Sequence, residues 1–213
     1  MKKIIIMGAG GHGQVVADAL LQMEEAEPVA FVDENPELHG KDVMKIPVPG
    51  GNAAISKIEH DGIVLALGNN ELRKNFFTEL TESGEQLFTV IHPSAIIAPN
   101  VKIGDGCMIL AGTVINTGAE IKDNTIINTN STIEHHNVIG PHAHIAPGAT
   151  LGGEVTVDEE AMVGIGATVL PRLTLSPKAV LGGGSTALKD IPEGATATGA
   201  PARLAGSTQK KTF

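Results

Sequence analysis

The sequence has very few aromatic residues and almost no cysteine. Its 213 residues include no tryptophan and no tyrosine; four of the five phenylalanines come before residue 90, and the fifth is the terminal Phe213. The second half of the chain therefore has no aromatic ring to bury before its last residue. The single cysteine, Cys107, excludes an intrachain disulfide, which favours a reducing cytoplasm as the compartment.

Long apolar runs are also missing. Only a few apolar residues follow Met1-Lys2-Lys3 before the glycines begin, which is too short for a signal peptide or a membrane span. We therefore expect a soluble protein without a membrane span. The formal net charge of −9 argues against nucleic acid as a partner. From residue 163 onward, however, the chain has six basic residues and only two acidic ones. This part of the chain is therefore the most favourable for binding an anionic ligand.

What the sequence has in abundance is a six-residue repeat. An aliphatic residue stands at every sixth position from Ile91 to Leu181, over sixteen consecutive repeats. A second set, four residues after each of these, is mostly small and includes Cys107, which we expect to be buried. A period of six fits neither an amphipathic helix nor an alternating strand. It predicts an all-β solenoid of short strands and tight turns, each coil stacked on the next, with a bore that only small and branched side chains can fill.

Residues 1–90 show the alternating pattern of a small α/β module. Strands are expected at 2–7, 28–32, 62–67 and 86–91, and helices after Gly13 and at 71–82. Such alternation predicts a parallel sheet with helices on its faces. Ligands of these sheets bind at the carboxyl ends of the strands. A glycine loop (8–13), the pair Asp33-Glu34 and the segment 68–70 all fall at these ends.

The glycine loop formally matches a dinucleotide-binding fingerprint, with Gly8, Gly10 and Gly13 at the glycine positions and Asp33 at the ribose position. The module is only about half the size of a two-part Rossmann domain, so we expect it to hold one nucleotide rather than NAD. The helix after the loop still offers its first amides to a phosphate. Without a ligand, the same residues would make an ordinary tight strand–helix turn.

Taken together, the glycine loop, Asp33-Glu34, the segment Gly68 to Lys74 and the hexads resemble the bacterial UDP-amino-sugar N-acetyltransferases and the related sialic acid O-acetyltransferases. These are hexapeptide-repeat acyltransferases, and the resemblance covers essentially the whole chain. It implies a Rossmann-like (βαβ) nucleotide-sugar-binding domain at 1–90 and a left-handed parallel β-helix that binds acetyl-CoA at 91–213. It also implies a homotrimer and transfer of acetyl from acetyl-CoA to the 4-amino group of a UDP-linked amino sugar, without a metal.

The resemblance also assigns site residues. The nucleotide sugar would meet Gly10, His12, Gly13, Asp33, Glu34, Gly68, Asn69, Asn70, Arg73 and Asn128. Acetyl-CoA would meet His144, Gly153, Ile165, Gly183 and Arg203, the last in a Gly-x-Pro-Ala-basic segment typical of the acyltransferases.

The hexad 133–138 carries the chemistry that we expect. Its turn holds Glu134, His135 and His136, and the resemblance places the catalytic base at His135. Imidazole suits this role because it accepts a proton near neutral pH. Three hexads make one coil, so Gly153, eighteen residues on, should stack on His135 and offer its amide to an oxyanion. The family commonly has a carboxylate directly after the base; here His136 stands there, and Glu134 is a sterically uncertain substitute. The alternative interpretation is that residues 134–136 are ordinary solvent-exposed turn residues with no catalytic role.

Two rival functions can be compared with the sequence. A γ-type carbonic anhydrase would need two zinc ligands five residues apart, and no two histidines of the repeat region have that spacing. A trimeric nucleotide-sugar sensor would keep Asp33 and the glycine loop but would not need His135 stacked on Gly153. The sequence also leaves open which amino sugar is used, whether the acceptor is an amine or a hydroxyl, and whether the base is uracil.

Overall fold

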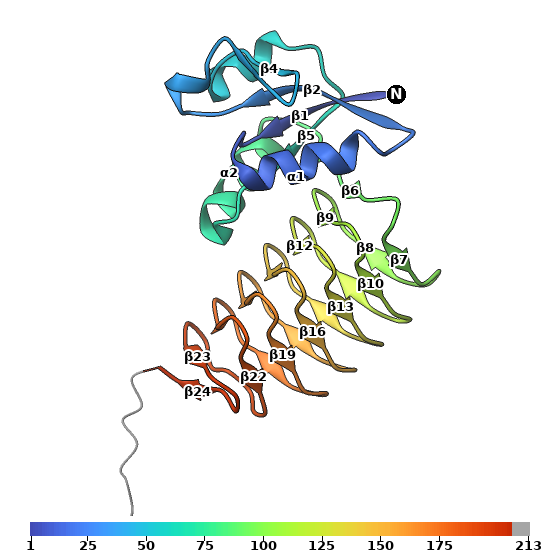
Figure 1. Cartoon of the computed structure of the whole chain (residues 1–213), viewed down its shortest axis with the longest axis vertical. Helices are drawn as coiled ribbons and strands as arrows, with labels where there is room; N and C mark the ends of the chain where they lie inside the picture. The colour runs from blue at the N-terminus through green and yellow to red at the C-terminus, as the bar shows by residue number, and fades with distance from the viewer. Residues whose placement is uncertain (206–213) are drawn as a thin grey trace, which may run out of the picture.

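A computed structural model describes residues 1–205 of the chain. Figure 1 shows an α/β module at the N-terminal end and, beside it, a long solenoid whose stacked coils run away from the module toward the C-terminus. Both parts of the expected fold are confirmed. No helix in residues 1–205 has the length and apolar character needed to cross a membrane.

The N-terminal module is built on a parallel sheet with the strand order β2–β1–β5. Its elements are β1 (Lys2–Met7), α1 (Gly11–Leu20), β2 (Ala26–Val32), the 3₁₀ helix η1 (Pro36–Leu38), β3 (Lys41–Val43), β4 (Ile46–Val48), the 3₁₀ helix η2 (Asn52–Lys57), β5 (Gly62–Leu65) and α2 (Asn70–Glu82). The sheet strands and both α-helices lie close to where the sequence predicts them. The antiparallel hairpin β3–β4 and the two 3₁₀ helices were not predicted.

The strand expected at 86–91 is wrong in part. Only β6 (Val90–Ile91) is a strand, and it pairs with the solenoid strand β9 instead of extending the N-terminal sheet. Within the described residues, the segment pairs with β5 only through an isolated bridge between Ile63 and Leu87. Between the two parts of the chain, residues 90–91 therefore pair in the register of the solenoid and not in that of the N-terminal sheet.

The solenoid consists of two-residue strands that recur every six residues. They are β6, β7 (Ile96–Ile97), β8 (Lys102–Ile103), β9 (Met108–Ile109), β10 (Val114–Ile115), β11 (Glu120–Ile121), β12 (Ile126–Ile127), β13 (Thr132–Ile133), β14 (Val138–Ile139), β15 (His144–Ile145), β16 (Thr150–Leu151), β17 (Thr156–Val157), β18 (Met162–Val163), β19 (Thr168–Val169), β20 (Thr174–Leu175), β21 (Val180–Leu181) and β22 (Thr186–Ala187). Two further strands, β23 (Thr196–Thr198) and β24 (Arg203–Leu204), close the C-terminal end as an antiparallel pair.

The solenoid strands form three parallel sheets around a narrow apolar core. One sheet includes β6, β9, β12, β15, β18 and β21; the second runs from β7 to β22; the third runs from β8 to β20. Neighbouring strands of a sheet are eighteen residues apart, so Ile133 lies beside Ile115 on one side and Leu151 on the other. The second residue of almost every strand is buried. Cys107 is buried too, as expected, and burial raises the pKa of its thiol to about 12.

Turns between the sheets stack into three edges, which we name by their residues. The first edge contains 129–130, 147–148, 165–166 and 183–184; the second contains 117–118, 135–136, 153–154 and 171–172; the third contains 123–124, 141–142, 159–160 and 177–178. The last residue of most turns has a positive φ, as at His136 (57°) and Glu154 (60°). This left-handed conformation turns the chain sharply between two sheets.

The module and the solenoid share a continuous core. Val16 and Leu20 of α1 pack in one buried cluster with Met108, Leu110 and Ile126 of the solenoid. At the third edge, α2 adds polar contacts, among them the ion pair of Lys74 with Glu160 at 2.7 Å. The N-terminal module is therefore fixed relative to the coils.

Candidate active site

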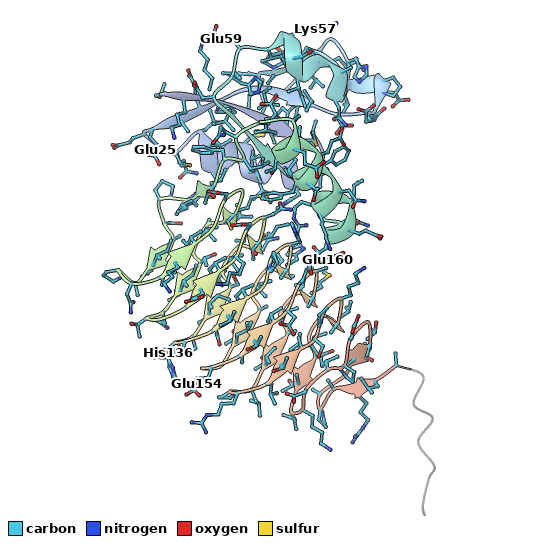
Figure 2. The ribbon with its side chains drawn as sticks, turned by 180° about the vertical axis from the view of Figure 1, so that it is seen from behind. Glu25, Lys57, Glu59, His136, Glu154 and Glu160 are labelled. Carbon is cyan, nitrogen blue, oxygen red and sulfur yellow. The ribbon has the colours of Figure 1, made fainter. Side chains whose placement is uncertain are left out.

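The expected base and its partner lie together on the second edge. The Nδ1 atoms of His135 and His136 are 3.1 Å apart, and the two rings are inclined by 76°. Both side chains are exposed. Figure 2 shows His136 and Glu154 on neighbouring coils of this edge, well away from Glu160, which lies next to the N-terminal module. An exposed imidazole at a fixed corner is accessible to a substrate.

Gly153 lies one coil beyond His135, as the eighteen-residue register predicts. The amide of the next residue, Glu154, donates to the carbonyl of His135 at 2.9 Å. The imidazole covers Gly153 so closely that a Cβ there would lie 2.5 Å from Nε2 of His135. Within residues 1–205, the Gly153 amide donates to no backbone acceptor. A free N–H beside a basic nitrogen is an arrangement that can hold an oxyanion while a proton is removed.

A second group of polar residues lies where the N-terminal module meets the solenoid. Asn128 contacts Nε2 of His144 through its amide nitrogen at 3.2 Å, and the ring of His12 stacks on His144 with centroids 6.5 Å apart. Burial, with the nearby charge of Arg73, lowers the pKa of His12 to about 4 and that of His144 to about 3. Both rings are therefore neutral at physiological pH. In the described residues, Nε2 of His12 and Nδ1 of His144 are buried without a hydrogen-bond partner.

The glycine loop and Asp33 form a preorganised turn. The Asp33 carboxylate accepts from the amides of Ala9 at 2.8 Å and Asn35 at 2.9 Å. Gly13 packs against the carbonyl of Gly8 so tightly that no side chain would fit there, and Gly10 is the N-cap of α1 without a side-chain cap. The first amides of α1 are therefore available to an anion. Glu34 accepts from the amide of Asn52 at 2.9 Å, which ties it to the start of η2.

Two residues expected to bind the substrate have a structural role instead. Arg73 is fully buried, and its guanidinium donates to the carbonyls of Leu67 at 2.9 Å and His142 at 2.6 Å, among others. Asn70 accepts from Arg73 at 3.0 Å and donates to the carbonyl of Glu160 at 2.9 Å. A side chain without exposed surface cannot meet a sugar, so the assignment of Arg73 to the substrate is wrong. Asn70 likewise has both ends of its amide engaged in holding the module on the third edge.

The remaining residues of the 68–73 segment sit at its surface. Gly68 and Asn69 are exposed, and the Asn69 side chain caps α2 by accepting from the amide of Leu72 at 2.9 Å. Sequence reasoning missed the contacts of the third edge, where Lys74 pairs with Glu159 and Glu160, both at 2.7 Å. The eighteen-residue spacing of the turns was the signal that could have found this edge.

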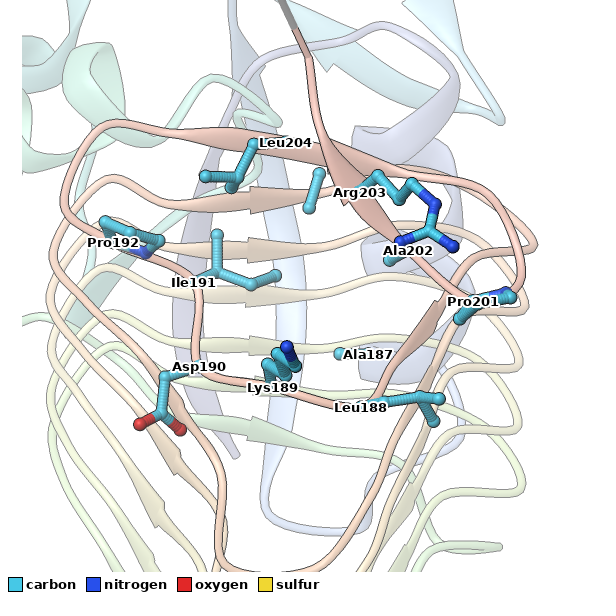
Figure 3. Close-up of a pocket in the computed structure, with 11 residues that line it drawn as sticks. Ala187, Leu188, Lys189, Asp190, Ile191, Pro192, Pro201, Ala202, Arg203 and Leu204 are labelled. Carbon is cyan, nitrogen blue, oxygen red and sulfur yellow. The ribbon is translucent and has the colours of Figure 1, made fainter. Parts of the chain in front are cut away.

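Of the residues expected to meet acetyl-CoA, Ile165 and Gly183 lie on the first edge, whereas Gly153 lies on the second edge and His144 in β15. The carbonyl of Ile165 accepts from the amide of Gly184 at 2.7 Å, which places Gly183 one coil beyond Ile165. Ile165 is 65% exposed, which is unusual for isoleucine. Arg203 lies at the end of the solenoid, on the rim of a hollow of about 470 Å³ that Figure 3 shows between β24 and the segment 187–192.

A single chain does not bring all these residues together. His135, His136 and Gly153 lie on the second edge, whereas Asn128 and Ile165 lie at the first edge, with the β7–β22 sheet between them. His12 and His144 are on the far side of the first edge, under the module. No group of three His, Cys, Asp or Glu side chains in the described part of the chain is arranged to hold a metal ion.

Comparisons with known proteins agree with this architecture. Residues 3–80 match the PglD N-terminal domain and residues 86–182 match the GMPPB C-terminal domain. A mutant of perosamine N-acetyltransferase from Caulobacter crescentus, solved with CoA and GDP-perosamine, is 32% identical with a TM-score of 0.91, covering 97% of this chain and 98% of that one. The chain belongs to the family of hexapeptide-repeat sugar N-acetyltransferases.

Other members of this sugar N-acetyltransferase family are similarly close. The acetyltransferase domain of PglB from Neisseria gonorrhoeae, solved with acetyl coenzyme A, is 32% identical with a TM-score of 0.88, over 95% of this chain and 98% of that one. UDP-N-acetylbacillosamine N-acetyltransferase from Bacillus subtilis is 37% identical over 114 residues. That match spans only about half of each protein, 52% of this chain and 52% of the relative.

Proposed function

We propose that this protein transfers acetyl from acetyl-CoA to the 4-amino group of a nucleotide-linked amino sugar. The observation that carries the proposal is the second edge, where the His135 imidazole covers Gly153 and the Gly153 amide is free. A nucleotide-sugar sensor would have no use for this pair. Relatives that cover nearly the whole chain and are described with CoA or acetyl coenzyme A add support.

The proposed reaction uses both groups of this edge. Nε2 of His135 takes a proton from the sugar amine as its nitrogen attacks the thioester carbonyl. The Gly153 N–H donates to the oxygen that becomes negative in the tetrahedral intermediate. Collapse of the intermediate breaks the carbon–sulfur bond, and the proton held by His135 passes to the departing thiolate to give CoA. The products are the N-acetylated sugar nucleotide and CoA.

The two halves of the site require more than one chain. Because the β7–β22 sheet separates the second edge from the first, a substrate at His135 of one chain reaches Asn128, His144 and the nucleotide loops only through another copy. We therefore propose a homotrimer with a site in each cleft between subunits. The outward face of that sheet carries Ile96, which is 67% exposed and would be covered there.

The two modules divide the binding. In the proposed arrangement the N-terminal module holds the nucleotide through the α1 amides and the Asp33 turn, and the solenoid holds acetyl-CoA along the first edge toward Arg203. The buried neutral pair His12 and His144 joins the two regions. A chain with one buried cysteine and acetyl-CoA as its donor fits the cytoplasm.

UDP is our first choice for the nucleotide, because the curated relative from Bacillus subtilis is described as acting on UDP-N-acetylbacillosamine. GDP is a second candidate, because structural relatives that match nearly the whole chain hold GDP-perosamine. Mass spectrometry of reactions with acetyl-CoA and a panel of UDP- and GDP-linked sugars tests both. We expect one acetyl group on a 4-amino sugar and none on the matching 4-hydroxy sugar. Acetylation of hydroxyls alone would indicate an O-acetyltransferase, and no product with any sugar would refute the proposal.

Subunit complementation tests the shared site. His135→Ala and Asn128→Ala each remove one half of every cleft, so either homotrimer should have little activity. Mixed trimers formed by refolding both variants together contain some clefts with both halves intact, and should recover part of the wild-type rate. If mixing restores nothing while both variants still form trimers, the two edges do not share a cleft.

A further inference from the structure

His135 and His136 are adjacent turn residues whose rings point in opposite directions along the second edge. The His135 ring covers Gly153, one coil toward the C-terminus. The His136 ring covers Gly118, one coil toward the N-terminus, where a Cβ would lie 2.6 Å from its Cδ2 atom. Between these two contacts, the Nδ1 atoms meet at 3.1 Å. Each ring therefore presents Nδ1 to its neighbour and keeps Nε2 outside the contact.

The backbone holds this pair in place. His136 has a φ of 57°, and its amide donates to the carbonyl of Thr117 at 3.0 Å. The His135 carbonyl accepts from the Glu154 amide at 2.9 Å. The turn is thus bonded to the coils on both sides, and the absence of side chains at Gly118 and Gly153 leaves room for the rings. The Nδ1 contact is a built feature of the edge rather than a chance meeting of two surface residues.

Two imidazole nitrogens at this distance share one proton. One Nδ1 must carry the hydrogen and the other must accept it. If His136 donates, neutral His135 has its own hydrogen on Nε2 and has no lone pair there to act as a base. If His135 donates, its Nε2 is free. Only in the second arrangement is the hydrogen bond between the two Nδ1 atoms kept when His135 takes up a proton on Nε2, because the ring still carries its Nδ1 hydrogen.

We propose that His136 is a positioning residue that accepts the Nδ1 hydrogen of His135 and thereby holds His135 in the tautomer with a free Nε2. The inference rests on the proposed function, in which Nε2 takes the proton of the sugar amine and returns it to the thiolate. His136 does with a neutral nitrogen what an orienting carboxylate would do with a charged oxygen. It fixes the tautomer without adding negative charge to the edge.

No carboxylate competes for this role within the described residues. Glu134 lies next to the pair, but its carboxylate is 3.4 Å from the backbone nitrogen of His135 and not on the ring. Glu154, the next residue along the edge from His136, pairs with Arg172 at 3.3 Å. Within the described residues, neither Glu134, Glu154 nor Arg172 bonds to Nδ1 of either ring. The Glu134 carboxylate contacts the backbone of His135 and so does not orient the ring in this structure.

Two substitutions at position 136 are matched for backbone conformation. Glutamate and lysine already occupy the equivalent turn position in this chain, at Glu154 with φ 60° and Lys178 with φ 59°. His136→Glu supplies a hydrogen-bond acceptor, whereas His136→Lys supplies only donors. We expect kcat of the glutamate variant to stay within a few-fold of wild type. The lysine variant should lose at least ~10-fold in kcat, with KM for both substrates little changed, since a disfavoured tautomer removes the base without removing binding contacts.

Nitrogen-15 spectra of histidine-labelled trimers read the tautomers directly, with assignments from variants lacking one ring. In the neutral pair, we expect His135 to carry its hydrogen on Nδ1 and His136 to carry its hydrogen on Nε2. In His136→Lys, His135 should shift toward the Nε2–H form. A hydrogen on Nε2 of His135 in the wild type, or a lysine variant with wild-type kcat, would overturn the inference. If the wild-type protein showed no acetyl transfer at all, the proposed function would be refuted, and the spectra would still show which tautomer each histidine adopts.

Discussion

Replacing Arg73 with methionine should loosen the N-terminal module from the solenoid. The guanidinium is fully buried and spans the two parts, bonding on one side to the Leu67 carbonyl and the Asn70 side chain. On the other side it bonds to the carbonyls of Asn124 at 3.2 Å, His142 at 2.6 Å and Ala143 at 3.3 Å. Methionine has a similar length but no donors, so these acceptors would stay buried and lose their partner.

The size of the effect follows from two opposing contributions. Hydrogen bonds from a charged donor are worth about 1.5 kcal/mol or more each, and Arg73 makes five. Against this, burial lowers the pKa of the guanidinium to about 10, which corresponds to a cost of roughly 3 kcal/mol for keeping it charged. The bonds outweigh the cost of burial. We expect Arg73→Met to lower the free energy of unfolding by about 3–5 kcal/mol.

Far-ultraviolet circular dichroism in urea suits the measurement, because the chain has no tryptophan or tyrosine to follow by fluorescence. Within residues 1–205, both α-helices lie in the N-terminal module, so the helical signal of this part reports on that module. Lys102→Met is a matched control that removes an exposed cation, paired with Glu120 at 2.8 Å, from the solenoid surface. The control should have the wild-type midpoint. An Arg73→Met protein as stable as the control would show that the buried guanidinium does not hold the two parts together.

Three further predictions concern the site. Gly153→Ala puts a Cβ 2.5 Å from Nε2 of His135, so the ring must move, and kcat in the acetyl-transfer assay should fall by ~10²-fold; a wild-type kcat would contradict the placement. Asp33→Ala removes the acceptor for the Ala9 and Asn35 amides, so calorimetry should show weaker binding of the sugar nucleotide and unchanged binding of acetyl-CoA; equal loss of both would refute the division between modules. His12 and His144 have pKa values lowered to about 4 and about 3 by burial, so the unfolded chain takes up protons that the folded chain does not. Stability should be complete above about pH 6.5 and should fall below it by about 2 kcal/mol per imidazole at pH 5; urea midpoints that do not change over this range would contradict the burial.

The solenoid and its register could both be predicted from the sequence. Burial of the aliphatic residues at six-residue intervals predicts coils that stack every eighteen residues, and this spacing alone predicts that Gly153 lies beside His135, as the structure shows. Local patterns also located the strands and helices of the N-terminal module, because each is set mainly by its own residues. The hairpin β3–β4 escaped prediction because its strands are only three residues long and carry no clear alternation.

What the sequence could not provide is the docking of the module on the coils. Arg73 lies 51 residues from Asn124 and 69 from His142, and neither spacing carries a periodic signal. The same holds for His12 and His144, whose stacking depends on how α1 is seated over β15. The segment 68–73 therefore divides into exposed positions, such as Gly68 and Asn69, and the buried Arg73 only once the two parts are assembled.

The most direct test of the account is the rate of acetyl transfer by His135→Ala compared with wild type, on a nucleotide-linked 4-amino sugar. A positioned general base is worth ~10²–10⁴-fold in rate, and the binding contacts lie elsewhere, in the glycine loop, the Asp33 turn and the first edge. The account predicts a loss of that size in kcat with KM for both substrates changed only modestly. A His135→Ala enzyme with near-wild-type kcat would contradict it, and if His136→Ala were inactive at the same time, the base would be the neighbouring residue.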